Sequence, residues 1–305
     1  MEELSKKVIV VVVTYNRKVL LKECLDALLS QKYQNFNILV IDNASTDGTK
    51  EYIEDVIDNE KVLYKNTGAN IGGAGGFNYG MKEACKFKCD YIWIMDDDTI
   101  VKEDSLEKLL LADKLLKGNY GFLSSSVLWK DGKTPCVMNR QKITKNWYEK
   151  SNYLKYSIIK TYYSTFVSFF IKKETVKKEG LPIKEFFIWG DDVEYTNRIS
   201  KKYDCYIIGN SQVIHKTKEN NGSDISKENG DRINRYKYAY RNECVVAREN
   251  GINGRIRQFA KVNYHILRVC FTKNTKKLKK IAIIINSSVK GIFFRPKIEY
   301  IEEEW

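Results

Sequence analysis

The feature that most constrains the fold is an alternation of apolar runs and helical patterns over the first 100 residues. Val8–Val13 is an unbroken run of β-branched side chains, which is typical of a strand buried on both faces. A helical pattern of apolar residues follows over Val19–Leu29. The alternation then continues with a strand at Phe36–Ile41, a helix at Lys50–Val56, a strand at Val62–Tyr64, a helix from the glycine-rich segment to about Phe87 and a strand at Tyr91–Met95. This rhythm predicts an α/β fold with a mostly parallel, doubly wound central sheet flanked by helices.

The rest of the chain follows a mixed pattern. Strands are predicted at Gly121–Trp129 and Ser164–Ile171, and a helix at Val193–Tyr203. Beyond about residue 220 the pattern is helical, over Tyr236–Arg248 and Arg255–Phe271. We therefore expect an α/β domain over residues 1–220 and a helical, basic C-terminal region over residues 221–305.

Composition limits the class of protein. The formal net charge is +13, and residues 251–305 contain twelve Lys and Arg against four Glu, so they account for +8 of it. Basic residues beside apolar ones favour an interfacial helix on an anionic membrane surface, although a solvated helix packed on the first domain is an equal alternative. The sequence has no RNP, zinc-finger or recognition-helix pattern, so we expect no nucleic-acid partner.

Location is inferred from the cysteines and the N-terminus. No stretch reaches the roughly 18 apolar residues that span a bilayer. The N-terminal apolar run ends in Thr-Tyr-Asn-Arg without a small-residue cleavage site, so we interpret it as a strand rather than a signal peptide. The seven cysteines form no CxxC pair. Reduced thiols in a cytoplasmic protein, peripheral on the inner face of the cell membrane, are the expectation.

Three aspartates, Asp96-Asp97-Asp98, directly follow the predicted strand Tyr91–Met95. Carboxylates this close repel one another unless a cation lies among them, and hard divalent cations prefer carboxylate oxygens. The alternative is a solvated loop with a helix N-cap at Asp98. The position at a strand end favours a metal and phosphate site, because ligands bind outside the carboxyl ends of strands in open α/β sheets.

Two further segments point to a nucleotide at the same edge. Asp42 follows a strand and can accept a hydrogen bond from an imide N–H, although an Asx turn would also explain it. The segment from Gly68 to Phe77 is rich in glycine, which lets backbone approach a ligand or simply makes a tight turn. A dinucleotide-binding G-x-G-x-x-G pattern beginning at Gly73 would require glycine where Asn78 stands, so a hydride-transfer enzyme is disfavoured.

A second acidic pair, Asp191-Asp192, follows Trp189-Gly190 at the start of a predicted helix. Acidic residues in a first helical turn are favoured by the helix dipole. Two adjacent acids beneath an aromatic exceed what a cap needs, and one of them could be a general base. His215, one of two histidines, ends a short strand and by itself has only a weak claim to be a ligand.

Taken together, these segments resemble glycosyltransferase family 2, in which segments like VVVTYNR, IDNASTDGT, NIGGAGGF and DDD occur in this order. The resemblance covers about residues 8–215 and implies a GT-A fold, with a nucleotide-binding half at 1–100 and an acceptor half at 101–220. It implies inverting, metal-dependent transfer with Mn²⁺ or Mg²⁺ as the cofactor. The implied roles are metal ligand for Asp96, Asp98 and His215, catalytic residue for Asp192 with Asp191 beside it, and nucleotide-sugar binding for Thr14, Tyr15, Asn16, Arg17, Asp42, Asn43, Asn70, Gly73, Gly75, Asp96, Asp97 and Trp189.

The donor and acceptor are finer expectations. NxGGxGGF and WGDDxEY, followed by an I-H-K segment, look like bacterial galactofuranosyltransferases, which use UDP-galactofuranose. Rhamnosyltransferases that use dTDP-rhamnose look similar over the first 100 residues and are the alternative. The expected acceptor is a hydroxyl of a growing, lipid-diphosphate-linked bacterial cell-surface glycan, and a homo-oligomer is left open. A nucleotidyltransferase and a non-catalytic nucleotide- or glycan-binding module are the competing classes.

Overall fold

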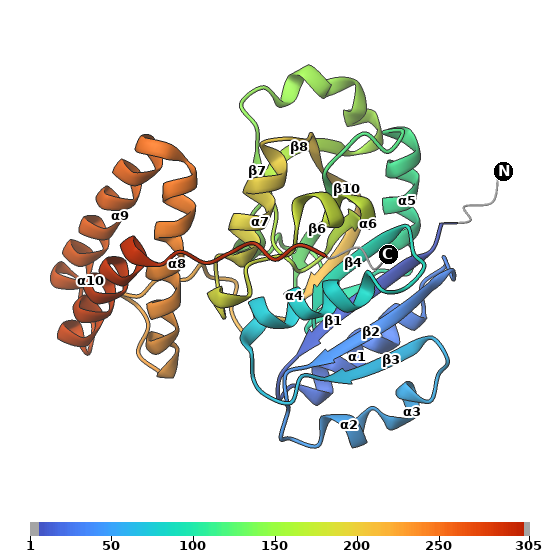
Figure 1. Ribbon diagram of the computed structural model, residues 1–305, viewed down its shortest axis with the longest axis horizontal. Helices are drawn as coiled ribbons and strands as arrows, with labels where there is room; N and C mark the ends of the chain where they lie inside the picture. The colour runs from blue at the N-terminus through green and yellow to red at the C-terminus, as the bar shows by residue number, and fades with distance from the viewer. Residues whose placement is uncertain (1–5, 302–305) are drawn as a thin grey trace.

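A computed structural model describes residues 6–301 of the chain (Figure 1). The first half forms the predicted alternation. Its elements are β1 (Val8–Thr14), α1 (Lys18–Leu29), β2 (Phe36–Asp42), α2 (Thr49–Tyr52), α3 (Glu54–Ile57), β3 (Val62–Asn66), α4 (Gly72–Ala84) and β4 (Tyr91–Asp96). The helix predicted at Lys50–Val56 is divided into α2 and α3, because Ile53 leaves the helical conformation and is buried.

The second half adds strands and helices to the same sheet. Its elements are β5 (Thr99–Val101), α5 (Ser105–Leu115), β6 (Phe122–Trp129), β7 (Lys142–Ile143), β8 (Ile158–Tyr163), β9 (Phe169–Lys172), α6 (Lys173–Glu179), α7 (Asp191–Ser200) and β10 (Cys205–His215), with short 3₁₀ turns at Val137–Asn139, Trp147–Tyr156 and Lys184–Phe186. The strand predicted at Ser164–Ile171 is wrong at its start. Its serine and threonine hydroxyls bond locally and to other side chains, Ser168 to Ser125 for example, and such bonds compete with a strand ladder.

The sheet order is β3-β2-β1-β4-β9-β6-β10-β8-β7, with β5 paired to β10. The pairs among β3, β2, β1 and β4 are all parallel, as expected. Beyond them the sheet is mixed rather than mostly parallel, because β9 runs antiparallel to both β4 and β6. The carboxyl ends of the four parallel strands therefore lie along one edge.

Helices cover both faces of this sheet, as alternate residues of β1 show. Val8, Val10 and Val12 face a core shared with α1, α3 and α5. Ile9 and Val11 face the opposite core, shared with α4, α6 and α7. The apolar run in β1 is thus explained by burial on both faces, and Val8 to Val12 have no solvent exposure.

The C-terminal helices stand together beside the sheet, at the left of Figure 1. They are α8 (Tyr236–Glu249), α9 (Gly251–Phe271) and α10 (Lys277–Phe293), and a 3₁₀ turn at Asp231–Arg235 precedes them. They share a small core of their own around Tyr240, Val269 and Ile284. After α10 the chain returns over the α/β part, where Glu299 accepts the Leu181 amide hydrogen. The predicted boundary near residue 220 stays a prediction. None of the helices within residues 6–301 is both long and apolar enough to cross a membrane.

Candidate active site

The polar residues that end β1, β2 and β4 come together at the carboxyl edge of the sheet. The register pairs Thr14 with Asp42 and Val13 with Asp96. Parallel pairing alone produces this convergence, since each strand ends at the same level. The residues predicted from three separate segments therefore line one edge.

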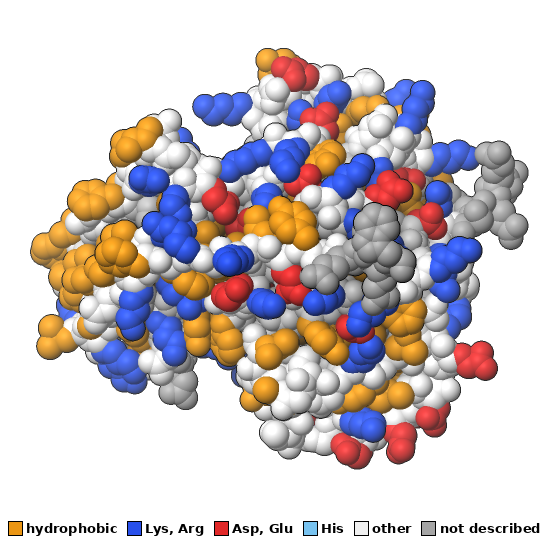
Figure 2. Space-filling view, viewed as in Figure 1, with side chains coloured by type: hydrophobic (Ala, Val, Ile, Leu, Met, Phe, Trp, Pro, Cys, Tyr) orange, Lys and Arg blue, Asp and Glu red, His pale blue; other side chains and the backbone are white. Residues whose placement is uncertain are grey.

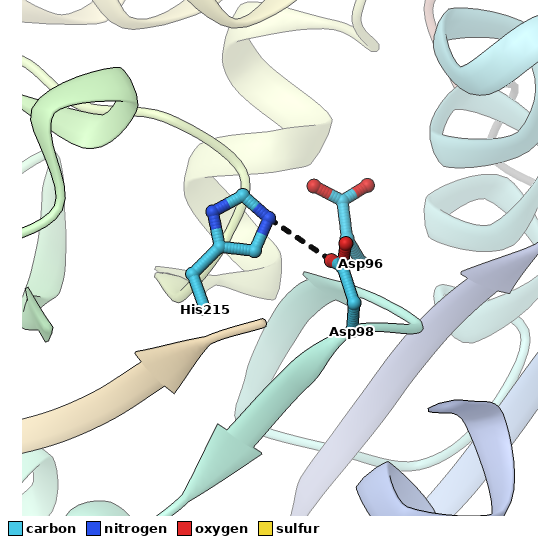
Figure 3. A group of neighbouring side chains, drawn as sticks. All are labelled: Asp96, Asp98 and His215. Carbon is cyan, nitrogen blue, oxygen red and sulfur yellow. Dashed lines mark ion pairs between the residues drawn. The ribbon is translucent and has the colours of Figure 1, made fainter. Parts of the chain in front are cut away.

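Asp96, Asp98 and His215 form a cluster suited to a metal ion. One ligand atom from each lies within 4.8 Å of the others (Figure 3). The antiparallel pairing of β5 with β10 places His215 opposite Thr99, which brings the imidazole beside Asp98. His215 Nε2 is 3.0 Å from Asp98 Oδ1.

His215 is held on its other side by Asn139. The Nδ1 and the Asn139 Oδ1 are 2.6 Å apart, and Cys136 Sγ lies 3.8 Å from the same nitrogen. Since an amide oxygen only accepts, Nδ1 carries the hydrogen and Nε2 is the atom that faces the carboxylates. Burial disfavours a charged imidazole, but bonds to Asp98 and Cys136 outweigh it and raise the pKa of His215 to about 10.

The pKa values of the three aspartates are shifted in different directions. Burial, with repulsion from Asp98, raises the pKa of Asp96 to about 7. Burial likewise raises the pKa of Asp97 to about 6, although that carboxylate accepts hydrogen bonds from Thr14 and Arg17 at 2.8 and 3.2 Å. Burial also opposes ionisation of Asp98, but His215 and Arg17 outweigh it and hold the pKa of Asp98 below its ordinary value.

The residues of this cluster fit a divalent cation. Asp98 Oδ1 is buried, and among residues 6–301 its near neighbour is His215 Nε2 at 3.0 Å, without a hydrogen bond of good geometry. A cation between the imidazole and the carboxylates would replace this contact and satisfy the buried oxygen. Two carboxylates and one imidazole are a donor set that Mn²⁺ accepts, and carboxylates with phosphate oxygens suit Mg²⁺.

A pocket of about 670 Å³ opens beside Asp42, within the size range of small-molecule sites. Asp42 Oδ1 accepts the Ser45 amide hydrogen at 2.8 Å, and Tyr64 donates its hydroxyl to the other carboxylate oxygen. The pocket is lined by Asp42, Ser45, Thr46, Gly48, Thr49, Lys50, Glu51, Tyr64 and Asn66. Asp42 thus occupies an Asx-type turn and borders a pocket at once, so the two interpretations of this residue are compatible.

The loop after β1 lies between this pocket and the metal cluster. Asn16 has a positive φ of 54°, and its side chain accepts the Thr46 amide hydrogen at 2.7 Å. Tyr15 is exposed, while Arg17 pairs with Asp98 at 2.7 Å. The loop is therefore held in place by contacts to both neighbouring segments.

Residues 72–77 of the glycine-rich segment form the first half of α4, and residues 68–71 precede the helix. A Cβ on Gly72 would come within 2.1 Å of the Phe187 carbonyl oxygen, and one on Gly76 within 2.5 Å of Val13 Cγ1. These glycines allow α4 to pack closely on β1 and on the loop at Phe187. This close packing is the tight-turn explanation of the glycines rather than the ligand-binding one. Asn43 and Asn70 bond the backbone of Gly72. The predicted ligand roles of Asn43, Asn70, Gly73 and Gly75 remain predictions.

The second acidic pair lies at the end of an unusual loop, residues 187–190. Phe187 and Trp189 have φ values of 66° and 65°, and Gly190 has 91°. Such conformations persist when surrounding contacts over-determine them. Asn242 of α8 supplies those contacts, since its fully buried amide donates to the carbonyls of Phe186 and Trp189 at 3.0 and 2.7 Å.

Asp191 and Asp192 begin α7, close enough to the first aspartate cluster for Asp191 to be affected by the charge of Asp96. Burial, with mutual repulsion, raises the pKa of Asp191 well above its usual value, and Asp96 adds to that repulsion. Burial raises the pKa of Asp192 to about 6, while the Val193 amide at 2.7 Å and the Tyr163 hydroxyl at 3.5 Å favour the carboxylate. Asp192 is the more accessible of the two, so it is the one that can meet a substrate.

Comparisons with known proteins identify the family of this chain. The model of the glycosyl transferase family 2 matches residues 9–177, which is more than half of the chain. The chain belongs to this family. An uncharacterized glycosyltransferase of Haemophilus influenzae is 35% identical over 119 residues, covering 37% of this chain and 46% of that protein. The galactofuranosyltransferase GlfT1 of Mycolicibacterium smegmatis is 28% identical over 203 residues, covering 64% of this chain and 66% of its own length.

A solved structure extends the likeness to the fold. GalNAc-T7, crystallised with UDP, GalNAc and Mn²⁺, superposes with a TM-score of 0.61 at 15% identity, over 77% of this chain and 48% of its own. This likeness establishes the GT-A fold for the present glycosyltransferase. The chain spans less than two thirds of the length of both curated relatives.

Four residues beside the site were missed from the sequence: Tyr64, Asn139, Tyr163 and Asn242. Each is a single polar residue in a segment without a motif, and each acts through a contact between residues at least 22 positions apart. Only Tyr163, which directly precedes the predicted strand at Ser164–Ile171, has a position in the sequence that could have drawn attention. Spacing along the chain does not signal the other three.

Proposed function

We propose that this glycosyltransferase moves galactofuranose from UDP-galactofuranose, with inversion, onto a hydroxyl of a lipid-linked bacterial cell-surface glycan. The observation that supports it best is a metal-type cluster with a separate acidic pair near it, together with a pocket of nucleoside size beside Asp42. The 28% likeness to GlfT1 supports the choice of sugar. An enzyme acting on such an acceptor works at the inner face of the cytoplasmic membrane.

In this proposal, one group of residues binds the donor and the second acidic pair acts on the acceptor. Asp96, Asp98 and His215 would hold Mn²⁺ or Mg²⁺, which neutralises a departing diphosphate as a Lewis acid. Asp42 and Tyr64 would orient the nucleobase in the pocket. Thr14 and Arg17 keep Asp97 in place, so the first loop and the aspartates form one rigid surface.

Asp192 would act on the acceptor. Its Oδ1 accepts the Val193 amide hydrogen at 2.7 Å, whereas Oδ2 has only the longer bond from the Tyr163 hydroxyl at 3.5 Å. Oδ2 would therefore take the proton of the attacking hydroxyl. The freed oxygen forms a bond to the anomeric carbon as the bond from that carbon to the diphosphate oxygen breaks. The electron pair leaves with UDP, and one displacement from the opposite face inverts the configuration. Asp191, whose pKa burial raises well above its usual value, would position its neighbour and the acceptor.

A donor screen tests this proposal. Purified protein with Mn²⁺ or Mg²⁺ is offered UDP-galactofuranose, UDP-galactopyranose, UDP-glucose and dTDP-rhamnose, and free nucleoside diphosphate is measured. Release from UDP-galactofuranose alone, lost in Asp98→Ala and kept in the exposed control Glu60→Gln, is the expected result. Release from dTDP-rhamnose alone would reject the galactofuranose donor and keep the mechanism. No release and no transfer from any donor would reject the enzyme in favour of a binding module.

A further inference from the structure

The outer side of α9 exposes a continuous apolar stripe. Only Val269 of its 21 residues is buried. Large apolar side chains recur at the three- and four-residue spacing of one helical face. They are Ile252, Ile256, Phe259, Leu267 and Phe271, and the exposed fractions of the two phenylalanines are 74% and 84%.

Helix α10 repeats the arrangement beside it. Its inner side packs on α8 so closely that a Cβ on Gly291 would come within 2.6 Å of the Arg241 carbonyl oxygen. Its outer side exposes Leu278, Ile285, Val289, Ile292 and Phe293. We call the exposed apolar residues of α9 and α10 the outer face. In Figure 2 they gather at the left edge of the molecule, over the two helices labelled there in Figure 1. Soluble monomers rarely expose an apolar patch of this extent.

The charge around the outer face has one sign. Residues 251–298 contain twelve Lys and Arg and no Asp or Glu. Lys261 and Arg268 form ion pairs with Glu243 and Asp224, which lie outside α9 and α10. No residue within 6–301 forms an ion pair with Arg255, Arg257, Lys273, Lys279 or Lys290. Figure 2 shows basic side chains beside the apolar ones.

This combination selects among possible occupants. A second copy of the chain would bring two unneutralised basic surfaces together, because the outer face offers no carboxylate to pair with them. A nucleic acid would satisfy the charges but leave the aliphatic side chains in water. An anionic bilayer satisfies both, since the acyl boundary takes the apolar side chains and the head groups take the Lys and Arg.

We propose that the outer face of α9 and α10 docks in the plane of an anionic lipid surface. Neither helix meets the criteria for a membrane span, so the docking is interfacial. The proposal is independent of the donor sugar, because these helices contribute none of the candidate site residues.

Helix α8 connects the docked helices to the loop that precedes the acidic pair. Helix α8 packs against α10 on one side and, through Asn242, fixes the backbone of residues 186–189 on the other. Trp189 also meets Tyr236 of α8 edge-on, with ring centroids 5.0 Å apart. Docking would therefore hold the acidic pair in a set orientation to the lipid surface, as a lipid-linked acceptor requires.

Sedimentation of the full chain with vesicles tests the proposal. We expect binding to vesicles of phosphatidylglycerol mixed with phosphatidylcholine and at least about tenfold weaker binding to phosphatidylcholine alone. The variant with Phe259→Asn, Phe271→Asn and Leu278→Asn should lose at least about tenfold of the binding. Arg257→Gln with Lys279→Gln should lose on the order of fivefold per side chain and show a weaker dependence on salt.

A matched control replaces three exposed apolar residues elsewhere, Leu111→Asn, Leu115→Asn and Tyr148→Asn, and should bind as the parent does. Donor turnover in solution, unchanged in all variants, shows that they are folded and keeps a failure of docking separate from a failure of the proposed function. Equal binding by the parent and the outer-face variant would overturn the proposal. So would a stable dimer that this variant dissociates, in a chain that does not bind vesicles.

Discussion

Asp98 of the metal cluster and Asp192 of the second acidic pair differ in the groups that surround their carboxylates. Asp98 has Arg17 within 2.7 Å and His215 within 3.0 Å, and its pKa is held low. Asp192 has a backbone amide and a tyrosine hydroxyl, and burial raises its pKa to about 6. A carboxylate that stays ionised suits a cation, whereas one with a raised pKa suits a proton, so Asp98 and Asp192 differ in this respect. Asp96 does not share the low pKa of Asp98, because burial and repulsion from Asp98 raise the pKa of Asp96 to about 7. The neighbours of the two carboxylates therefore favour different roles for the same residue type, which is what the proposed function assigns to them.

The largest expected effect comes from removing a carboxylate of the metal cluster. Asp98→Asn should lower transfer by more than about a thousandfold, because several kcal/mol of stabilisation of the departing diphosphate disappear. Titration with Mn²⁺, followed by its electron paramagnetic resonance, should show binding lost as well. EDTA should have the same effect on the parent protein. Normal Mn²⁺ binding by Asp98→Asn would contradict the proposed role of Asp98 as a metal ligand.

Replacing the acid on the other side should separate the two roles. Asp192→Asn should reduce transfer by about a hundred- to a thousandfold, since the acceptor hydroxyl loses its base. Its Mn²⁺ affinity should equal that of the parent, in contrast to Asp98→Asn. If Asp192→Asn instead abolished Mn²⁺ binding, the two clusters would form one site and the division of labour would be wrong.

Removing the side chain that holds His215 in place should have an intermediate effect on Mn²⁺ affinity. Asn139→Ala removes the acceptor that holds Nδ1 of His215, and loss of such a partner lowers metal affinity by about ten- to a hundredfold. Saturating Mn²⁺ should restore most of the turnover, because the ligands themselves remain. The exposed control Asn221→Ala should leave the affinity unchanged. An affinity unaffected in Asn139→Ala would show that His215 is not a ligand.

The smallest expected effect is a shift in pH dependence. At saturating Mn²⁺, transfer should fall about tenfold per pH unit below about pH 6, because protonated Asp192 cannot accept a proton. Tyr163 favours the ionised form, so Tyr163→Phe raises that pKa and should move the acid limb upward by at most about one pH unit. Tyr162→Phe, on an exposed neighbour, is the control. A limb that stays in place in Tyr163→Phe would assign it to another group.

Much of the fold and part of the site could be predicted from the sequence. Parallel strands bring their carboxyl ends to one edge whatever the details of packing, so Asp42 and Asp96 could be assigned to a common crevice from periodicity alone. The mixed half of the sheet could not, because antiparallel β9 is inserted between β4 and β6 from a distant part of the chain. The sequence left two explanations for the glycine-rich segment, close approach to a ligand or close packing of the backbone. The contacts of Gly72 and Gly76 with other segments support close packing.

The sequence by itself determined the chemistry that is available: an acidic triplet at Asp96–Asp98, an acidic pair at Asp191-Asp192, one histidine at the end of a strand, and a basic segment over residues 251–298 without Asp or Glu. Local patterns of burial and periodicity carry that information. Only the tertiary structure shows how the surroundings of these carboxylates differ, because the pKa values of Asp98 and Asp192 depend in part on His215 and Tyr163, which lie 117 and 29 residues away. It also decided that the apolar stripes of α9 and α10 stay exposed, since α8 packs against their other sides. Electrostatic environment and burial are properties of the folded chain, and no spacing in the sequence encodes them directly.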